Sequence, residues 1–265
     1  MFSYTDIIVL RFFVSSGLIG VYAAAWNISE FLILFSGALS STLFPEMSSL
    51  SAKEDSQAIA RIVEQSLSFA GLFLIPGLFG GSLLGERILR IYGSEFPKGA
   101  TILTLLIVAN LLMGYQNQLL NTLNAIDRPD LAFRVNLVFI GANVVLNIIL
   151  IYLYGWTGAA AATMASVAAS LVIAYYHVDS VIDFAVPTEE IAKQWLAAVL
   201  MGCVVYAGLR IESTYSLLNH NLATVVLFTV FGASVYFAVL LAISTEFRSV
   251  VDQNVPFDLP VLSSG

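Results

Sequence analysis

Seven apolar runs, each long enough to cross a bilayer, constrain this 265-residue chain more than any other feature. A helix needs about 20 apolar residues to span the hydrocarbon core. The runs cover residues 18–44, 66–84, 100–124, 131–153, 158–177, 191–209 and 217–243. Short polar segments separate them, and the first run ends at Pro45. We therefore expect an all-α integral membrane protein with about seven full transmembrane helices.

A shorter apolar run precedes these seven. It covers residues 2–14, is too short to span a bilayer, and is followed by Ser15-Ser16-Gly17. Asp6 and Arg11 interrupt it, which is atypical of a signal peptide. We expect a truncated first helix here. Its Arg11 either points into a central cavity or extends to the membrane interface.

Composition supports the membrane assignment and excludes other classes. Hydrophobic residues make up 58% of the chain and charged residues 11%, whereas a soluble domain has about a quarter charged. The net charge of −7 argues against nucleic-acid binding. One cysteine, Cys203, and two histidines are too few for a Cys- or His-based metal site. Cys203 lies in an apolar run and is expected to be buried. Catalytic motifs are absent from the sequence, so we predict neither an enzyme nor a cofactor.

The run at 66–84 contains helix-breaking residues. Pro76-Gly77 and Gly80-Gly81 fall inside it, which predicts a kink or a locally broken helix. The polar segment before it, Met47–Gln57, contains Ser51-Ala52-Lys53-Glu54, which matches a capping box and predicts the start of an interfacial helix that is amphipathic through Gln65.

Asparagines recur at helical spacing within two of the runs. They are Asn110, Asn117, Asn121 and Asn124 in run 100–124, and Asn136, Asn143 and Asn147 in run 131–153. Each set lies on one helical face, and Gln116 and Gln118 flank the first. Such faces either line a polar cavity or form hydrogen bonds between helices. Both interpretations stay open on the sequence alone.

Run 18–44 carries Asn27 and Glu30 one helical turn apart. A carboxylate within a span is costly and usually faces a cavity or a partner. Glu30 could therefore line a cavity, couple to an ion, pair with a cation or lie near the interface. In run 158–177 the stripe of small residues Gly158, Ala162, Ser166 and Ser170 predicts close packing of two helices.

Several motifs, in this order along the chain, resemble one family of transporters. They are Gly20-Val21-Tyr22 with Phe44-Pro45, the segment Ile88–Phe96, the segment Asn121–Pro129, and the segment Asn147–Thr163. Together they resemble the C-terminal half of polysaccharide-biosynthesis flippases of the O-antigen type. These belong to the multidrug/oligosaccharidyl-lipid/polysaccharide exporter superfamily.

The resemblance implies an architecture. Such flippases have about fourteen helices, in two six-helix lobes plus an extra pair. Residues 1–178 resemble the helices of the C-terminal lobe, the first one incomplete, and residues 179–245 the additional pair. Residues 246–265 are expected to form a flexible tail. The loops after runs 18–44, 100–124 and 158–177 would be cytoplasmic, as would the C-terminus.

The resemblance also implies a function and partners. The chain would be part of a cell-membrane transporter that flips lipid-linked oligosaccharide or polysaccharide precursors by alternating access. Its partners would be the bilayer, the lipid-linked glycan and a complementary N-terminal lobe. The cavity candidates are Arg11, Asn27, Glu30, Asn110, Asn117, Asn121, Asn136 and Asn143. Two alternatives remain: an ion-coupled small-molecule exporter of the multidrug type, and an inactive or partner-dependent half-transporter.

Overall fold

The computed structural model describes residues 10–11, 16–215 and 220–254, and every regular element within them is helical. The longer helices are α2 (Ser16–Ser51), α3 (Ser56–Ala70), α4 (Leu74–Leu89), α5 (Ala100–Ala125), α6 (Pro129–Tyr154), α7 (Trp156–Asp179), α8 (Thr188–Tyr215), α9 (Asn221–Ile243) and α10 (Thr245–Asn254). A short 3-10 helix, η2 (Phe96–Gly99), precedes α5. The helix expected over residues 2–14 lies outside the described residues, apart from Leu10 and Arg11.

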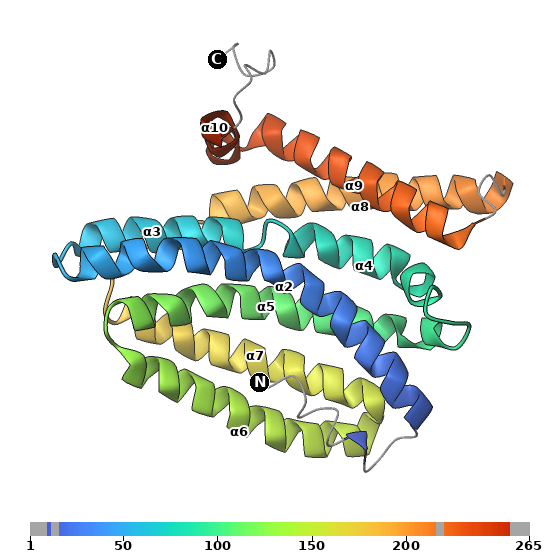
Figure 1. Ribbon diagram of the computed structural model, residues 1–265, viewed down its shortest axis with the longest axis horizontal. Coiled ribbons are helices and arrows are strands. Elements are labelled where there is room, and N and C mark those ends of the chain that lie inside the picture. Colours follow the sequence, from blue (N-terminus) through green and yellow to red (C-terminus); the bar gives the residue numbers. More distant parts are fainter. Residues whose placement is uncertain (1–9, 12–15, 216–219, 255–265) are drawn as a thin grey trace.

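The predicted spans are confirmed. In the part of the chain that the structure describes, seven helical segments are long and apolar enough to cross a membrane, with α3 and α4 forming one of them. They lie along the long axis of the molecule, and the chain reverses at each end (Figure 1). The loops after α2, α5 and α7 gather at one end, and those after α4, α6 and α8 at the other. This alternation fits a chain that crosses a bilayer repeatedly.

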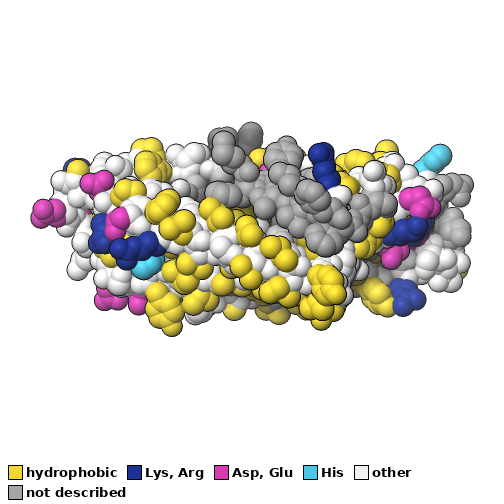
Figure 2. All heavy atoms as spheres, turned by 90° about the horizontal axis from the view of Figure 1, so that it is seen from below, with side chains coloured by type: hydrophobic (Ala, Val, Ile, Leu, Met, Phe, Trp, Pro, Cys, Tyr) yellow, Lys and Arg dark blue, Asp and Glu magenta, His cyan; other side chains and the backbone are white. Residues whose placement is uncertain are grey.

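The surface also fits a lipid environment. Figure 2 shows apolar side chains across the middle of one face and charged side chains at both ends. Helix α6 exposes large side chains such as Phe133 and Ile148, which are 62% and 54% accessible. In lipid such exposure costs nothing, because the solvent is itself apolar. The prediction that Cys203 is buried is wrong for the same reason: it lies exposed on α8, where lipid can cover it.

Packing divides the helices into two groups. Helices α2, α5, α6 and α7 form a bundle, with α5 in contact with α2 and α7. Helices α8 and α9 form a hairpin that packs on the far side of α4 (Figure 1). Helix α4 contacts both α5 and α8, so it connects the bundle to the hairpin. The small-residue stripe of α7 is buried from Gly158 to Ser170, as its spacing predicts.

The break expected in the second span is present, but one turn earlier than Pro76 and the glycines predicted. Helix α3 ends at Ala70, and α4 begins at Leu74 after a turn at residues 71–73. Pro76 falls in the first turn of α4. Proline is tolerated there because the N–H groups of a first turn have no partner within the helix.

Three boundaries differ from the sequence-based expectation. Helix α2 does not end at Pro45 but continues to Ser51, since Met47 beyond the proline is buried in the bundle core. Helix α3 starts at Ser56, not at the capping box, because Glu54 adopts a positive φ of 58°. Asp55 caps it instead, accepting a hydrogen bond from the Ala58 N–H at 3.0 Å.

The tail beyond residue 245 is the third difference. Residues 245–254 form helix α10, where a flexible tail was expected from residue 246. The Ser244 hydroxyl precedes this helix and accepts a hydrogen bond from the Phe247 N–H at 2.9 Å. This N-terminal cap satisfies one of the free donors of the first turn and favours the helix. Residues 255–265 lie outside the described residues.

Gly158 offers a test of the α6–α7 packing. A Cβ at this position would collide with the Leu150 carbonyl of α6, a backbone group that cannot move aside. We expect Gly158→Ala to lower the free energy of unfolding by about 2 kcal/mol, as overpacking does. The matched control is Gly141→Ala on α6, where an added Cβ meets nothing within 4 Å. That change should be neutral or stabilising, because alanine favours helix. Thermal unfolding in detergent measures both, and equal midpoints for the two variants would contradict the packing.

Candidate functional site

An apolar groove lies between α2, α4, α8 and α9, with a volume of about 350 Å³. Most of its lining is aliphatic or aromatic, including Phe31 of α2, Phe73 just before α4 and Phe228 of α9. Glycines of α4 line it as well. A Cβ at Gly77 would lie 2.7 Å from a Leu32 methyl, whereas one at Gly80 would meet nothing within 4 Å. The absent side chain of Gly80 therefore leaves part of the groove open.

Polar contacts hold the α8–α9 hairpin to α4 at one end of the groove. Arg87, in the last turn of α4, donates to the Glu212 carboxylate of α8 at 2.7 Å. The Asn221 side chain, at the start of α9, donates to the Arg87 carbonyl at 2.7 Å. The Glu212 side chain is only 8% exposed, so its charge depends on Arg87 for compensation. We call these three residues the Arg87 clamp.

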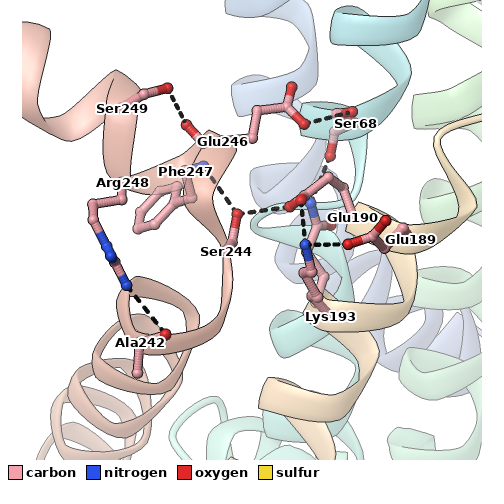
Figure 3. Close-up of polar contacts among 11 residues, drawn as sticks. Ser68, Glu189, Glu190, Lys193, Ala242, Ser244, Glu246, Phe247, Arg248 and Ser249 are labelled. Atoms are coloured by element: carbon pink, nitrogen blue, oxygen red, sulfur yellow. Dashed lines mark hydrogen bonds and ion pairs between the residues drawn. The ribbon is translucent and has the colours of Figure 1, made fainter. Parts of the chain in front are cut away.

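A second set of contacts joins the hairpin to the α3–α4 break at the opposite end. The Gln194 amide of α8 donates to the Ser68 carbonyl at 2.5 Å. The Ser244 hydroxyl donates to Glu190 at 2.6 Å, and Ser68 donates to Glu246 of α10 at 3.4 Å (Figure 3). Lys193 binds Glu190 at 2.7 Å and pairs with Glu189 as well. We call this set the Ser68 cluster.

The carboxylate of Glu246 is electrostatically unusual. Partial burial raises its pKa above the ordinary value of 4.5, and repulsion from Glu190 raises it further. Lys193 and the Ser68 hydroxyl act in the opposite direction but do not outweigh burial. Docking of α10 is therefore favoured when Glu246 is protonated.

Two of the predicted cavity residues are buried, and one of them, Asn143, forms a hydrogen bond to a neighbouring helix. Asn143 of α6 donates to the Thr163 hydroxyl of α7 at 3.4 Å and accepts from Asn147 at 3.0 Å. This geometry fits the packing interpretation of the second asparagine set. Asn110 of α5 is also buried, with 6% of its surface accessible.

The glutamines that flank the first asparagine set form hydrogen bonds from α5 to its neighbours. Gln116 accepts from Ser170 of α7 at 3.0 Å, and Gln118 accepts from Ser40 of α2 at 3.2 Å. Asn117 and Asn121, between and beyond them, are half-buried. Gln116 and Gln118 therefore supply interhelical hydrogen bonds of α5, and Asn117 and Asn121 stay predictions as cavity residues.

The remaining candidates lie nearer the surface. Asn27 and Glu30 are exposed on α2, Arg11 is exposed, and Asn136 of α6 is half-buried. The buried residues of α2, such as Tyr22 and Ala25, lie on the face that packs against the bundle core. Asn27 and Glu30 are therefore polar groups on an exposed surface of a membrane-spanning helix. Their role as substrate contacts remains a prediction.

Several residues of this region could not have been singled out from the sequence. Arg87 and Glu212 are 125 positions apart. Each lies at the end of an apolar run, where charged residues are common in membrane proteins, so neither stands out in the sequence. Gln194 and Ser68 are likewise remote in sequence. Helical periodicity does not predict either of these contacts, because both depend on how the hairpin packs on its neighbouring helices.

The Arg87 clamp predicts a coupling energy. Arg87→Met leaves Glu212 buried without its partner, and we expect a loss of about 1–3 kcal/mol. This is below the ~3–5 kcal/mol of a fully buried pair, because Arg87 is 30% exposed. Adding Glu212→Gln should recover part of that loss. A double-mutant cycle on thermal midpoints measures the coupling, and strictly additive effects would show that the pair does not hold the hairpin.

Glu246 predicts a pH dependence. Its raised pKa in the docked state means that docking is strongest below the ordinary glutamate pKa and weakens as the pH rises through the raised value. A nitroxide at Ser249→Cys, in a Cys203→Ser background, should become more mobile over that range. In Glu246→Gln the mobility should stay low throughout. A probe equally mobile at all pH values in both proteins would contradict the assignment.

Comparison with known proteins places these features in context. The family model described as lipid II flippase MurJ matches residues 3–231 of the chain. A probable flippase of Haloferax volcanii, AglR, is 36% identical over 255 residues, which are 95% of this chain and 52% of that protein. A probable low-salt glycan biosynthesis flippase of the same organism, Agl15, is 28% identical over 82% of this chain and 46% of that protein.

A solved structure shares the fold. Lipid II flippase MurJ in an inward closed conformation superposes with a TM-score of 0.72 at 18% sequence identity. The match covers 93% of this chain and 50% of that structure. The chain thus spans about half the length of the relatives it matches.

Proposed function

This chain belongs to the lipid II flippase MurJ family, and on that premise we propose that it supplies half of a transporter that flips a lipid-linked oligosaccharide across the membrane by alternating access. The observation that carries the proposal is the apolar groove between α2, α4, α8 and α9. It lies in a membrane protein that also carries amide side chains within its spans. A glycan on a lipid carrier combines an apolar tail, which suits the groove, with a polar sugar, which suits the amides.

The groove suits the lipid portion of such a substrate. Its lining offers dispersion contacts and no charge that an apolar chain would have to desolvate. Polar contacts at its two ends, the Arg87 clamp and the Ser68 cluster, hold the hairpin in place beside it. The lipid tail can therefore stay in an apolar environment while the sugar moves.

The glycan portion needs hydrogen-bonding groups and a counter-charge. Asn117, Asn121 and Asn136 are half-buried amides that can bind sugar hydroxyls. Exposed Arg11 can meet a phosphate through its planar guanidinium group. Glu30 supplies a carboxylate for a coupling ion. Asn110 and Asn143 are buried here and would join the path only in another conformation of the lobe.

A second lobe is inferred from the free-energy cost of exposing polar side chains of α2 to lipid. Asn27 and Glu30 lie exposed on a spanning helix, and a carboxylate in contact with lipid costs several kcal/mol. A second lobe that covers this face and encloses water removes that cost. Since the chain spans about half the length of its relatives, we propose that an N-terminal lobe performs this role.

Filling the groove tests the proposal. Gly80→Leu places a side chain where an added Cβ meets nothing, so the fold should tolerate it while the lipid tail is excluded. We expect flipping of a lipid-linked oligosaccharide by the intact protein in liposomes to fall at least tenfold. The matched control is Gly141→Leu on α6, which also has open space but lies away from the groove lining. Unchanged flipping in Gly80→Leu would remove the groove from the transport path.

A combined Asn117→Ala, Asn121→Ala change tests the amides. If they bind sugar hydroxyls, flipping of the glycan-bearing lipid should slow, whereas the unfolding midpoint should change little because both are half-buried. Ser234→Ala on α9 is the control, since Ser234 is exposed and donates to the Val230 carbonyl of its own helix. Wild-type flipping by the double variant would exclude these amides as glycan ligands.

A second candidate is an ion-coupled exporter of small cations. The observation that favours it is Glu30, an exposed carboxylate within a span. Efflux of a cationic dye that depends on Glu30 and is indifferent to Gly80→Leu would support the exporter over the flippase.

A further inference from the structure

An apolar pocket with a volume of about 450 Å³ lies between α4 and α8, apart from the groove. None of its described lining residues also lines the groove. The lining includes Ser82 and Leu83 of α4 and Val199, Cys203 and Tyr206 of α8. The three residues of α8 are exposed, so in a membrane the pocket opens to lipid. We call it the α4–α8 pocket.

A cation lies at one end of this pocket. Arg210 follows Tyr206 by one turn of α8, and its Nε and one terminal nitrogen donate to the Tyr206 hydroxyl at 2.9 and 2.7 Å. The guanidinium carbon lies 5.1 Å from the centroid of the same ring. Tyr206 therefore holds the guanidinium beside the pocket. A guanidinium has five N–H donors, and with two of them on Tyr206, three stay available to a ligand.

The charge of Arg210 is not balanced by the described residues of α4 and α8. None of their carboxylates forms an ion pair with it, and Glu212 is paired with Arg87 instead. Glu86 and Arg90 lie four residues apart at the end of α4, a spacing at which opposite charges attract, so their charges offset each other. A cation on a spanning helix is costly in lipid without a counter-charge. An anionic group bound at Arg210 would supply that counter-charge.

The distance from the pocket to Arg210 matches the depth of one lipid leaflet. Helix α8 rises about 16 Å from Val199 to Arg210, at ~1.5 Å per residue. One leaflet contributes about 15 Å, which is half of the ~30 Å hydrocarbon core. Arg210 lies near the end of α8, where the chain reverses (Figure 1). A lipid with its headgroup at Arg210 can therefore lay an acyl chain along the pocket as far as Val199.

We propose that the α4–α8 pocket and Arg210 form a binding site for one anionic phospholipid of the bilayer, with its phosphate on Arg210 and an acyl chain in the pocket. The planar guanidinium can bind two phosphate oxygens at once. A zwitterionic lipid binds less well, because its own ammonium group already offsets the phosphate charge. The bound lipid bridges α4 and α8, and this inference does not depend on glycan transport.

Native mass spectrometry of the intact protein in detergent tests the proposal, with phosphatidylglycerol and phosphatidylcholine of the same acyl chains added in equal amounts. We expect the protein to retain phosphatidylglycerol preferentially, and Arg210→Gln to lower that retention at least fivefold. Arg134→Gln, which changes an exposed arginine of α6 outside the pocket lining, is the matched control and should leave it unchanged. Equal retention of the two lipids by the wild type, or undiminished retention of phosphatidylglycerol in Arg210→Gln, would overturn the proposal.

Cys203 shows whether the lipid binds in the pocket. It is the single cysteine of the chain and lines the pocket, so its alkylation by N-ethylmaleimide reports on this place alone. In the wild type, phosphatidylglycerol should slow the alkylation at least threefold, and in Arg210→Gln it should have little effect. Cys203→Phe fills the pocket and should lower the retention of phosphatidylglycerol as well. An alkylation rate that does not change while the wild type retains the lipid would place the lipid elsewhere and contradict the site.

Discussion

Lipid offers no hydrogen bonds, and this one constraint accounts for most of the polar architecture of the chain. A polar group within a span must find its partner in the protein. Gln194 meets the requirement at the α3–α4 break, where it binds the Ser68 carbonyl that the interrupted helix leaves free. Gln116 and Gln118 meet it by accepting from serines of neighbouring helices. Asn27 and Glu30 are exposed among the described residues, and this exposure is the physical reason for the proposed second lobe.

The groove is a consequence of how the hairpin is held. Helices α8 and α9 contact α4 along its length, and the polar contacts lie at the two ends. Between those ends α4 carries glycines that line the groove, so no side chain of α4 fills the groove at these positions. An apolar channel with polar ends suits a long apolar chain. The break in the second span supports this arrangement, because it lets α3 remain with the bundle while α4 contacts the hairpin.

The sequence predicts the spans well and the tertiary pairings poorly, for a physical reason. Hydropathy is a local property, so each of the seven spans could be placed from composition, and helix breakers predicted a break in the second span, which lies one turn before them. The pairing of Arg87 with Glu212 depends on where α8 packs, which no local pattern encodes. The asparagine stripes were ambiguous because cavity lining and interhelical bonding require the same periodicity. The structure resolves part of that ambiguity, since Asn143 bonds across to α7. Helix α10 was missed because its cap comes from a single serine beyond an apolar run.

The most direct test of the account is to locate the lipid on the protein. An isoprenoid-linked sugar with a photoreactive group on its tail is crosslinked to the intact protein in liposomes, and the adducts are mapped by mass spectrometry. Adducts should concentrate on groove residues such as Phe31, Thr229 and Ala233, and unlabelled lipid-linked sugar should compete with them. Adducts spread evenly over exposed apolar side chains, such as Phe133 and Ile148 of α6, would contradict it.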